Sequence, residues 1–218
     1  MNTTRIGRPG RYRELEIRTE GLDRLVFFSD GVFAIAITLL ILDIRLPNIE
    51  VPMSNAQLLQ ELIALWPKFS AYLFSFLVVA LFWVKHHTAY RYIRAYDARL
   101  IWLNMLLLLI VAFIPFPTAV MSFQNNGVAT AFYSLTMAMG FVASALIWRH
   151  AMRGNRLVSE ELSPETSRII LISSLLAAGI FLLSSGVSLV DPGWGRLVLL
   201  LLIPAANSHL WKKAVLRG

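Results

Sequence analysis

The 218-residue sequence contains no cysteine and few charged residues. The absence of cysteine excludes a disulfide framework and a thiol nucleophile. Charged residues make up only 15% of the chain, whereas hydrophobic residues make up 57%. A soluble domain carries about 25% charged residues, so this chain has too little polar surface to coat a globule in water.

The sequence also lacks the motifs of several functional classes. It has no Walker phosphate loop, no Gly-x-Ser-x-Gly elbow and no His-Glu-x-x-His zinc motif. No span carries Arg or Lys at every third position, and the Thr-Val-Gly-Tyr-Gly filter is missing. We therefore expect no enzyme, no cofactor, no voltage sensor and no carbonyl selectivity filter.

Long apolar runs dominate what is present. About 20 apolar residues, each rising about 1.5 Å, cross a hydrocarbon core of about 30 Å. The sequence has six runs near that length: Val26–Ile44, Phe69–Val84, Leu100–Phe116, Val128–Trp148, Ile169–Val190 and Leu197–Trp211. These runs predict an all-α integral membrane protein with six transmembrane helices.

The basic residues predict the orientation of the chain. With six spans, 17 of the 20 Lys and Arg residues fall on one side, and only Arg45, Lys68 and Arg196 fall on the other. An excess of Lys and Arg marks the cytoplasmic side, so both termini are expected there. This placement also favours contact with membrane lipids over nucleic acid as the reason for the net charge of +7.

One membrane domain is expected. We divide the chain into a basic cytoplasmic tail (1–24), a six-span membrane domain (25–213) and a short cytoplasmic C-terminus (214–218). The tail is expected to be mostly disordered as far as about Thr19. Pro115 and Pro117 are expected to end the third span, whereas Ser163 and Pro164 are typical of a helix start.

Polar residues lie at similar depths near the cytoplasmic ends of several spans. They are Ser29 and Asp30 in the first span, His86 and His87 in the second, Asn104 in the third, and Asn207 and His209 in the sixth. Polar groups in a membrane favour mutual hydrogen bonds. We predict an interhelical cluster of Ser29, Asp30 and one of the two histidines. Two alternatives are a snorkelling Asp30 and a metal site, although adjacent histidines on a helix point about 100° apart.

One face of the first span forms a stripe. Gly31, Ile35, Thr38 and Leu42 are spaced by four, three and four residues, with Leu39 beside them. Small residues and threonine are common at contacts between membrane helices. From spacing alone, helix packing is therefore the favoured interpretation.

A resemblance to a known family adds a second interpretation. The motif Arg24-x-x-x-Phe28-Ser29-Asp30 resembles the Arg-x-x-x-Phe-Ser-Asp signature of the transmembrane protein 175 family of potassium channels. The similarity extends over roughly the first 120 residues and includes Phe82-Trp83-x-x-His86-His87, Leu103-Asn104 and Pro115-Phe116-Pro117.

The resemblance implies a pore lined by the first helix of each subunit around a four-fold axis. It places an apolar constriction at Ile35, a hydroxyl layer linked to potassium preference at Thr38, and further apolar rings at Leu39 and Leu42, with Gly31 on the same face. The signature residues would be structural, together with Trp83, His86, His87 and Asn104. It also implies a homotetramer in a prokaryotic plasma membrane that conducts K⁺ passively with modest selectivity.

A small proton-coupled secondary transporter is the alternative function. Asp30 and either His86 or His87 would then form a proton relay. Against this, Gly and Pro cluster at the ends of the spans, and no span contains a break near its middle of the kind that builds a transport site.

Overall fold

The computed structural model describes residues 9–45, 52–124 and 126–202. In these residues all the regular structure is helical, apart from an isolated antiparallel bridge between Ile93 and Val158. Among the described residues, five helical segments are long and apolar enough to cross a membrane: Glu20–Asp43, Trp66–Tyr90, Ala98–Gln124, Gly127–Asn155 and Pro164–Ser188. The chain is thus a multi-pass membrane protein.

Most of the sixth predicted run lies outside the described residues. Only its beginning is seen, in the short helix α8 (Pro192–Leu199) and the turn that follows it. The polar residues Asn207 and His209, and the C-terminal segment 214–218, also lie outside the described residues.

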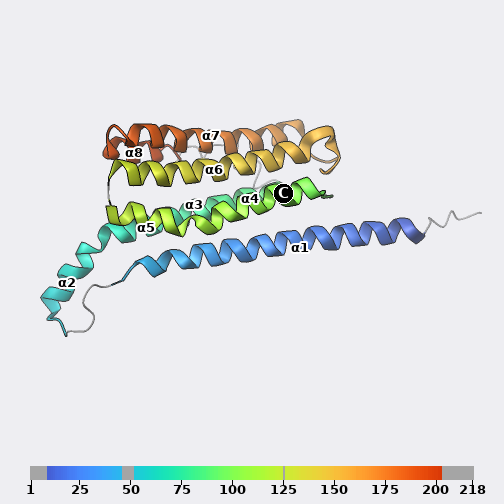
Figure 1. Ribbon diagram of the computed structural model, residues 1–218. Coiled ribbons are helices and arrows are strands. Elements are labelled where there is room, and N and C mark those ends of the chain that lie inside the picture. Colours follow the sequence, from blue (N-terminus) through green and yellow to red (C-terminus); the bar gives the residue numbers. More distant parts are fainter. Residues whose placement is uncertain (1–8, 46–51, 125, 203–218) are drawn as a thin grey trace, which may run out of the picture.

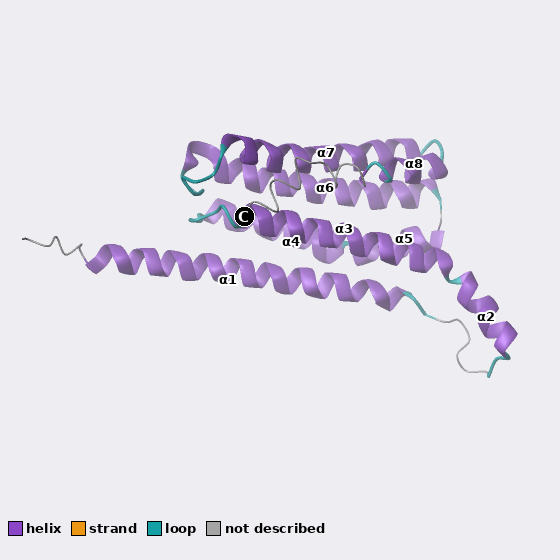
Figure 2. Cartoon of the chain, turned by 180° about the vertical axis from the view of Figure 1, so that it is seen from behind, coloured by secondary structure: helices purple, strands orange, loops and turns teal. Residues whose placement is uncertain are grey.

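The helices are arranged in three groups (Figure 1). The first is the long helix α1 (Pro9–Leu39), which continues as the 3₁₀ turn η1 (Leu40–Asp43). The second contains α3 (Trp66–Tyr90), α4 (Ala98–Phe113) and α5 (Pro115–Gln124). The third contains α6 (Gly127–Met152), the turn η2 (Arg153–Asn155), α7 (Pro164–Ser188) and α8. The reverse view shows the same order, with α1 on the outer side (Figure 2).

The start of α1 corrects the prediction for the N-terminal tail. We expected disorder to about Thr19, but the helix begins at Pro9 and runs through Arg24 and Leu25 without a break. Proline suits the first helical position, and the Arg, Glu and Leu residues that follow have high helix propensity. From Pro9 onward, the basic tail and the first span therefore share one helix.

The prolines of the third span also act differently from the prediction. They do not end the span, because α5 begins at Pro115 and extends the helical segment to Gln124. Proline cannot donate to the carbonyl of Val111, and that oxygen instead accepts from the N–H of Ile114 at 3.1 Å. The backbone is interrupted for one residue and then resumes.

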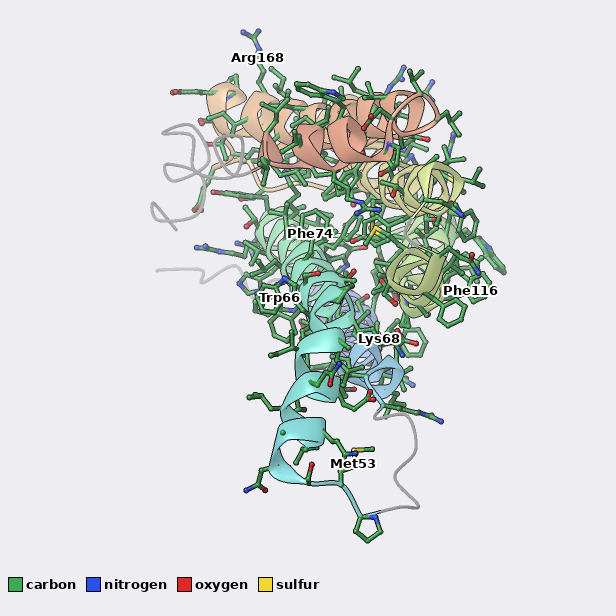
Figure 3. All side chains as sticks on the ribbon, turned by 90° about the vertical axis from the view of Figure 1, so that its left-hand side faces the viewer. Met53, Trp66, Lys68, Phe74, Phe116 and Arg168 are labelled. Carbon is green, nitrogen blue, oxygen red and sulfur yellow. The ribbon has the colours of Figure 1, made fainter. Side chains whose placement is uncertain are left out.

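Side-chain caps mark several helix starts. Ser163 accepts from Thr166 N at 3.1 Å with Pro164 at the first helical position, which confirms the predicted start of α7. Ser54 and Gln57 form a reciprocal capping box at α2 (Asn55–Ala64). The sequence analysis missed α2. This helix leans away from the bundle, with Met53 near its tip (Figures 1 and 3).

The packed centre lies between the second and third groups of helices. Phe82 of α3 stacks on Phe141 of α6 with ring centroids 4.0 Å apart, and Phe141 stacks on Phe181 of α7 at 5.7 Å. Gly140 permits this contact, because a Cβ there would lie only 2.6 Å from Phe82 Cζ. α1 packs against α3 and α4 at the edge of this core.

Candidate pore-lining helix and its polar anchors

One face of α1 packs against the rest of the chain. Its buried residues recur at intervals of three or four: Leu22, Leu25, Ser29, Phe33, Ala36 and Leu40. This is the periodicity of one helical stripe, and it faces α3 and α4. The rotation of α1 about its axis is therefore fixed by its own core.

The predicted stripe lies away from that core. Ile35 is 60% exposed, Leu42 is 55% exposed and Leu39 is 42% exposed. Thr38 and Gly31 are also exposed, and a Cβ added at Gly31 would meet no atom within 4 Å. Packing among the residues that the structure describes therefore does not account for these five residues.

The hydroxyl of Thr38 has a defined orientation. Its Oγ1 lies 3.0 Å from the carbonyl oxygen of Ala34 and 2.9 Å from that of Ile35, so the hydroxyl hydrogen is donated to the helix backbone. The lone pairs of Oγ1 are left as acceptors on an exposed helix face. A cation passing this face would meet an oxygen ligand within an otherwise apolar stripe.

A buried polar cluster joins α1 to α3 and α4. Asn104 Nδ2 donates to Ser29 Oγ at 2.9 Å, and Asn104 Oδ1 accepts from Tyr90 at 3.0 Å and lies 3.0 Å from His86 Nε2. The Ser29 hydroxyl donates a hydrogen bond to the carbonyl oxygen of Leu25 at 2.8 Å. Ser29, His86 and Asn104 are thus brought together, and Tyr90, which the sequence analysis missed, completes the cluster.

Asp30 lies in a separate contact. Its Oδ1 accepts from Trp83 Nε1 at 2.9 Å, and no hydrogen bond joins it to His86 or His87. His87 is exposed and stacks on Trp83 with ring centroids 5.4 Å apart. The two histidines therefore face different surroundings, and the single cluster expected around Asp30 is divided into two.

The other signature residues lie on the surface of the subunit. Phe28 is 56% exposed, and Arg24 is exposed one turn earlier on α1.

Among residues 9–45, 52–124 and 126–202, no group of three or more His, Cys, Asp or Glu is placed to hold a metal ion.

The far end of α1 is held by a second set of polar contacts. Asp43 Oδ2 accepts from Ser122 of α5 at 2.9 Å, and Lys68 of α3 donates to the Asp43 carbonyl at 3.3 Å. The side chain of Lys68 lies beside the end of α1 in Figure 3. The contacts at Ser29 and at Asp43 thus anchor the segment on both sides of the stripe. The sequence analysis did not include Asp43 or Ser122.

Comparison with known proteins identifies the family. A family model described as "Endosomal/lysosomal potassium channel TMEM175" matches residues 24–115, starting at Arg24. A potassium channel of Streptomyces collinus is 38% identical over 173 residues, which cover 77% of this chain and 82% of that protein. The chain belongs to the TMEM175 family. The family membership that the sequence resemblance indicated is confirmed.

Two further TMEM175 relatives extend the comparison. The crystal structure of a lysosomal potassium-selective channel TMEM175 homolog from Chamaesiphon minutus superposes with a TM-score of 0.75 at 29% identity, covering 86% of this chain and 97% of that one. A human protein named endosomal/lysosomal proton channel TMEM175 is 39% identical over 98 residues, which are 43% of this chain and 19% of that protein. The relatives are ion channels rather than enzymes.

Proposed function

We propose that this chain is one subunit of a potassium-permeable cation channel whose pore is lined by α1. The observation that carries the proposal is the stripe of α1, which is apolar except for the Thr38 hydroxyl and is left exposed by the other residues that the structure describes. The names of the bacterial relatives supply the ion, K⁺.

A pore requires several copies of the chain. One helix face cannot enclose a channel, so copies must be arranged around an axis, and we propose a homotetramer. The surfaces of the first two spans support assembly. In the most apolar stretch of each span, only 28% is buried in Glu20–Asp43 and in Trp66–Tyr90, whereas 67% is buried in Gly127–Asn155. We further propose six spans, both termini in the cytoplasm and residence in a prokaryotic plasma membrane.

The stripe accounts for conduction in physical terms. A ring of Ile35 side chains would form a narrow apolar constriction that gates by dewetting. Four Thr38 oxygens one turn further on would contact a partly hydrated cation without replacing its whole hydration shell. Selectivity for K⁺ is then modest, because no cage of carbonyl oxygens surrounds the ion. Leu39 and Leu42 would continue the apolar lining.

A proton-coupled transporter is less well supported. The relay would need a proton path between Asp30 and a histidine, but Asp30 accepts from Trp83 and His86 contacts Asn104. Protonation of His86 would also place a hydrogen on Nδ1, which is buried without a partner. A buried donor without an acceptor is costly, so the cluster favours a neutral, structural His86.

The test of the proposal is substitution at the constriction. Ile35→Asn replaces an apolar ring with amides and lowers the barrier to wetting, so K⁺ flux through reconstituted liposomes should rise several-fold. Ile172→Asn is the matched control, since Ile172 on α7 is 51% exposed and lies outside the stripe. Equal flux in wild type and Ile35→Asn, with intact tetramers, would place the constriction elsewhere.

A further inference from the structure

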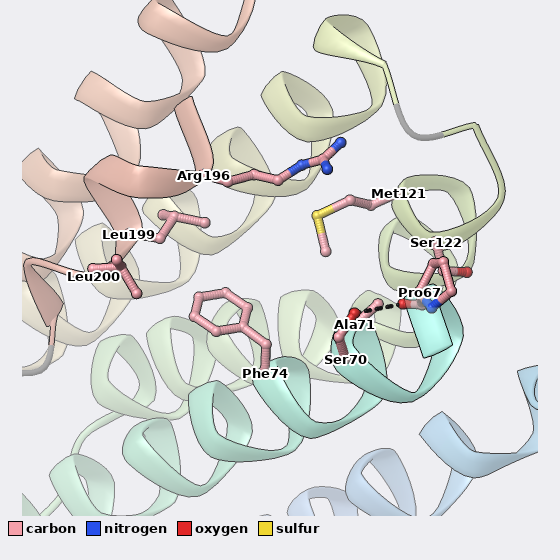
Figure 4. Close-up of a pocket in the computed structure, with 9 residues that line it drawn as sticks. All are labelled: Pro67, Ser70, Ala71, Phe74, Met121, Ser122, Arg196, Leu199 and Leu200. Atoms are coloured by element: carbon pink, nitrogen blue, oxygen red, sulfur yellow. Dashed lines mark hydrogen bonds between the residues drawn. The ribbon is translucent and has the colours of Figure 1, made fainter. Parts of the chain in front are cut away.

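A cavity of about 230 Å³ lies between α3, α5 and α8, at the end of the bundle where η1 ends at Asp43. Its walls are mainly apolar and include Phe74, Met121, Leu199 and Leu200. Figure 4 shows these side chains on opposite walls. The charge distribution predicts that this end of the bundle is external.

One charged side chain enters this apolar cavity. Arg196 extends from α8 towards Met121 of α5 (Figure 4). Its Nε is buried and has no hydrogen-bond partner. Within the part of the chain that the structure describes, no hydrogen bond or ion pair involves the Arg196 guanidinium. A buried N–H without an acceptor is costly, so the Nε of Arg196 favours a bound acceptor, and an anion suits the charge of the guanidinium.

The other polar side chains near this cavity already have hydrogen-bond partners within the subunit. The carboxylate of Asp191 caps α8 through Oδ1, which accepts from Gly193 N at 2.7 Å and Trp194 N at 2.9 Å, and no ion pair joins it to Arg196 among the described residues. Ser122 donates to Asp43 or to the carbonyl of Ala119, and Ser70 donates to the carbonyl of Pro67 at 2.8 Å. Arg196 is therefore the donor that a ligand in this cavity would meet.

We propose that this cavity binds a membrane amphiphile with an oxyanion head group, which pairs with Arg196 while its acyl chain lies against Phe74, Met121 and Leu199. A guanidinium binds phosphate or carboxylate oxygens through two parallel hydrogen bonds, which satisfies the buried Nε. The apolar walls suit a hydrocarbon chain and disfavour a small hydrated anion. The site is separate from the α1 stripe and does not depend on conduction.

Native mass spectrometry of the intact full-length channel can test this site without measuring current. Phosphatidylglycerol and phosphatidylcholine are added in turn to the delipidated protein. We expect phosphatidylglycerol to be retained in preference to phosphatidylcholine. Arg196→Gln should weaken that retention by at least about tenfold, as expected for the loss of a charge-assisted pair. Arg196→Lys should restore part of it. Arg45→Gln removes an exposed arginine from the same predicted side of the membrane and should leave phosphatidylglycerol retention unchanged.

A second variant leaves the guanidinium in place. Ser70→Trp adds bulk at an exposed lining position and should block the acyl chain, with loss of the same lipid. Competition by oleate would support the proposal with a carboxylate as the head group. Equal retention of both phospholipids, or unchanged phosphatidylglycerol binding in a folded Arg196→Gln variant, would overturn it. Competition by inorganic phosphate alone would also overturn it, because no acyl chain would then be required.

Discussion

A single buried amide determines how α1 lies on the rest of the subunit. Asn104 is fully buried and makes side-chain hydrogen bonds to Ser29 of α1 and to Tyr90 and His86 of α3. Because an amide oxygen can only accept, the contact of Oδ1 with His86 requires the imidazole hydrogen to be on Nε2. The cluster thus fixes one tautomer of His86 together with the position of α1.

The amide can be removed without adding volume to the core. Asn104→Leu leaves Ser29, Tyr90 and His86 with unmet hydrogen bonds, which we expect to destabilise the channel by about 1–3 kcal/mol. The measurement is the thermal unfolding midpoint of the purified protein. Gln60→Leu removes an exposed amide from α2 and serves as the control. A midpoint for Asn104→Leu equal to that of the control would show that the cluster does not stabilise the fold.

The contacts of Asp97, which lies outside the membrane spans, predict that the stability of the fold depends on pH. It caps α4 through Leu100 N at 2.8 Å and contacts His150 Nε2 at 2.9 Å. Burial by itself would raise the pKa of Asp97, but the hydrogen bonds from Leu100 and His150 and the charges of His150 and Arg156 outweigh it and hold the pKa below 3.8. Because folding lowers this pKa, the carboxylate stabilises the fold fully above 3.8 and progressively less as the pH falls below that value.

The corresponding experiment compares wild type with Asp97→Asn across the acid range. The wild type should be the more stable near neutral pH, and the difference should shrink below about pH 4. Asp23→Asn, an exposed charge removal on α1, should show no such convergence. A constant difference down to pH 3 would mean that the carboxylate does not contribute through its ionised form.

The depth of a residue along its span correctly predicts part of the buried polar cluster. Ser29, His86 and Asn104 fall at one height in antiparallel helices, and the structure joins them. Depth does not fix the rotation of a helix about its axis, so the contact of Asp30 with Trp83 and the inclusion of Tyr90 could not be derived from the sequence. Both follow from the side-chain packing of α1 on α3.

At the scale of the elements, apolar runs locate helices better than they locate helix ends. The second run predicts Phe69–Val84, whereas α3 extends from Trp66 to Tyr90. Polar and basic residues at helix ends carry little hydropathic signal, yet they continue the helix when propensity and caps permit it. The same reasoning explains the early start of α1. The third span continues past Pro115 for a different reason, because its backbone is interrupted for one residue and then resumes as α5.

The number of spans can be tested by labelling single cysteines, since the sequence has no cysteine of its own. Gln124→Cys and Glu160→Cys are exposed positions on either side of α6 and should react from opposite sides of the membrane. A third cysteine at Gly218 should react from the same side as Glu160 if six spans are present. Reaction of Gly218→Cys together with Gln124→Cys would indicate five spans.

At the scale of the whole molecule, composition alone predicts the class. The low charge and the long apolar runs predict a multi-pass helical protein, and five such segments are described. The assembly cannot be derived in the same way. The stripe of Gly31, Ile35, Thr38 and Leu42 has the composition of an ordinary packing face, and only its exposure in the folded chain separates it from the core of α1.

The most direct test of an α1-lined potassium pore is the reversal potential of the purified channel in a bilayer under a potassium–sodium gradient. Wild type should show unitary currents whose reversal potential is shifted from zero towards the equilibrium potential of potassium. Thr38→Val preserves shape but removes the oxygen ligands, so the reversal potential should move towards zero with tetramers intact. Thr136→Val is the control, because Thr136 makes the same kind of intrahelical bond, to Phe132, on α6. An unchanged reversal potential in Thr38→Val, or flux coupled stoichiometrically to protons without unitary currents, would contradict the proposed pore.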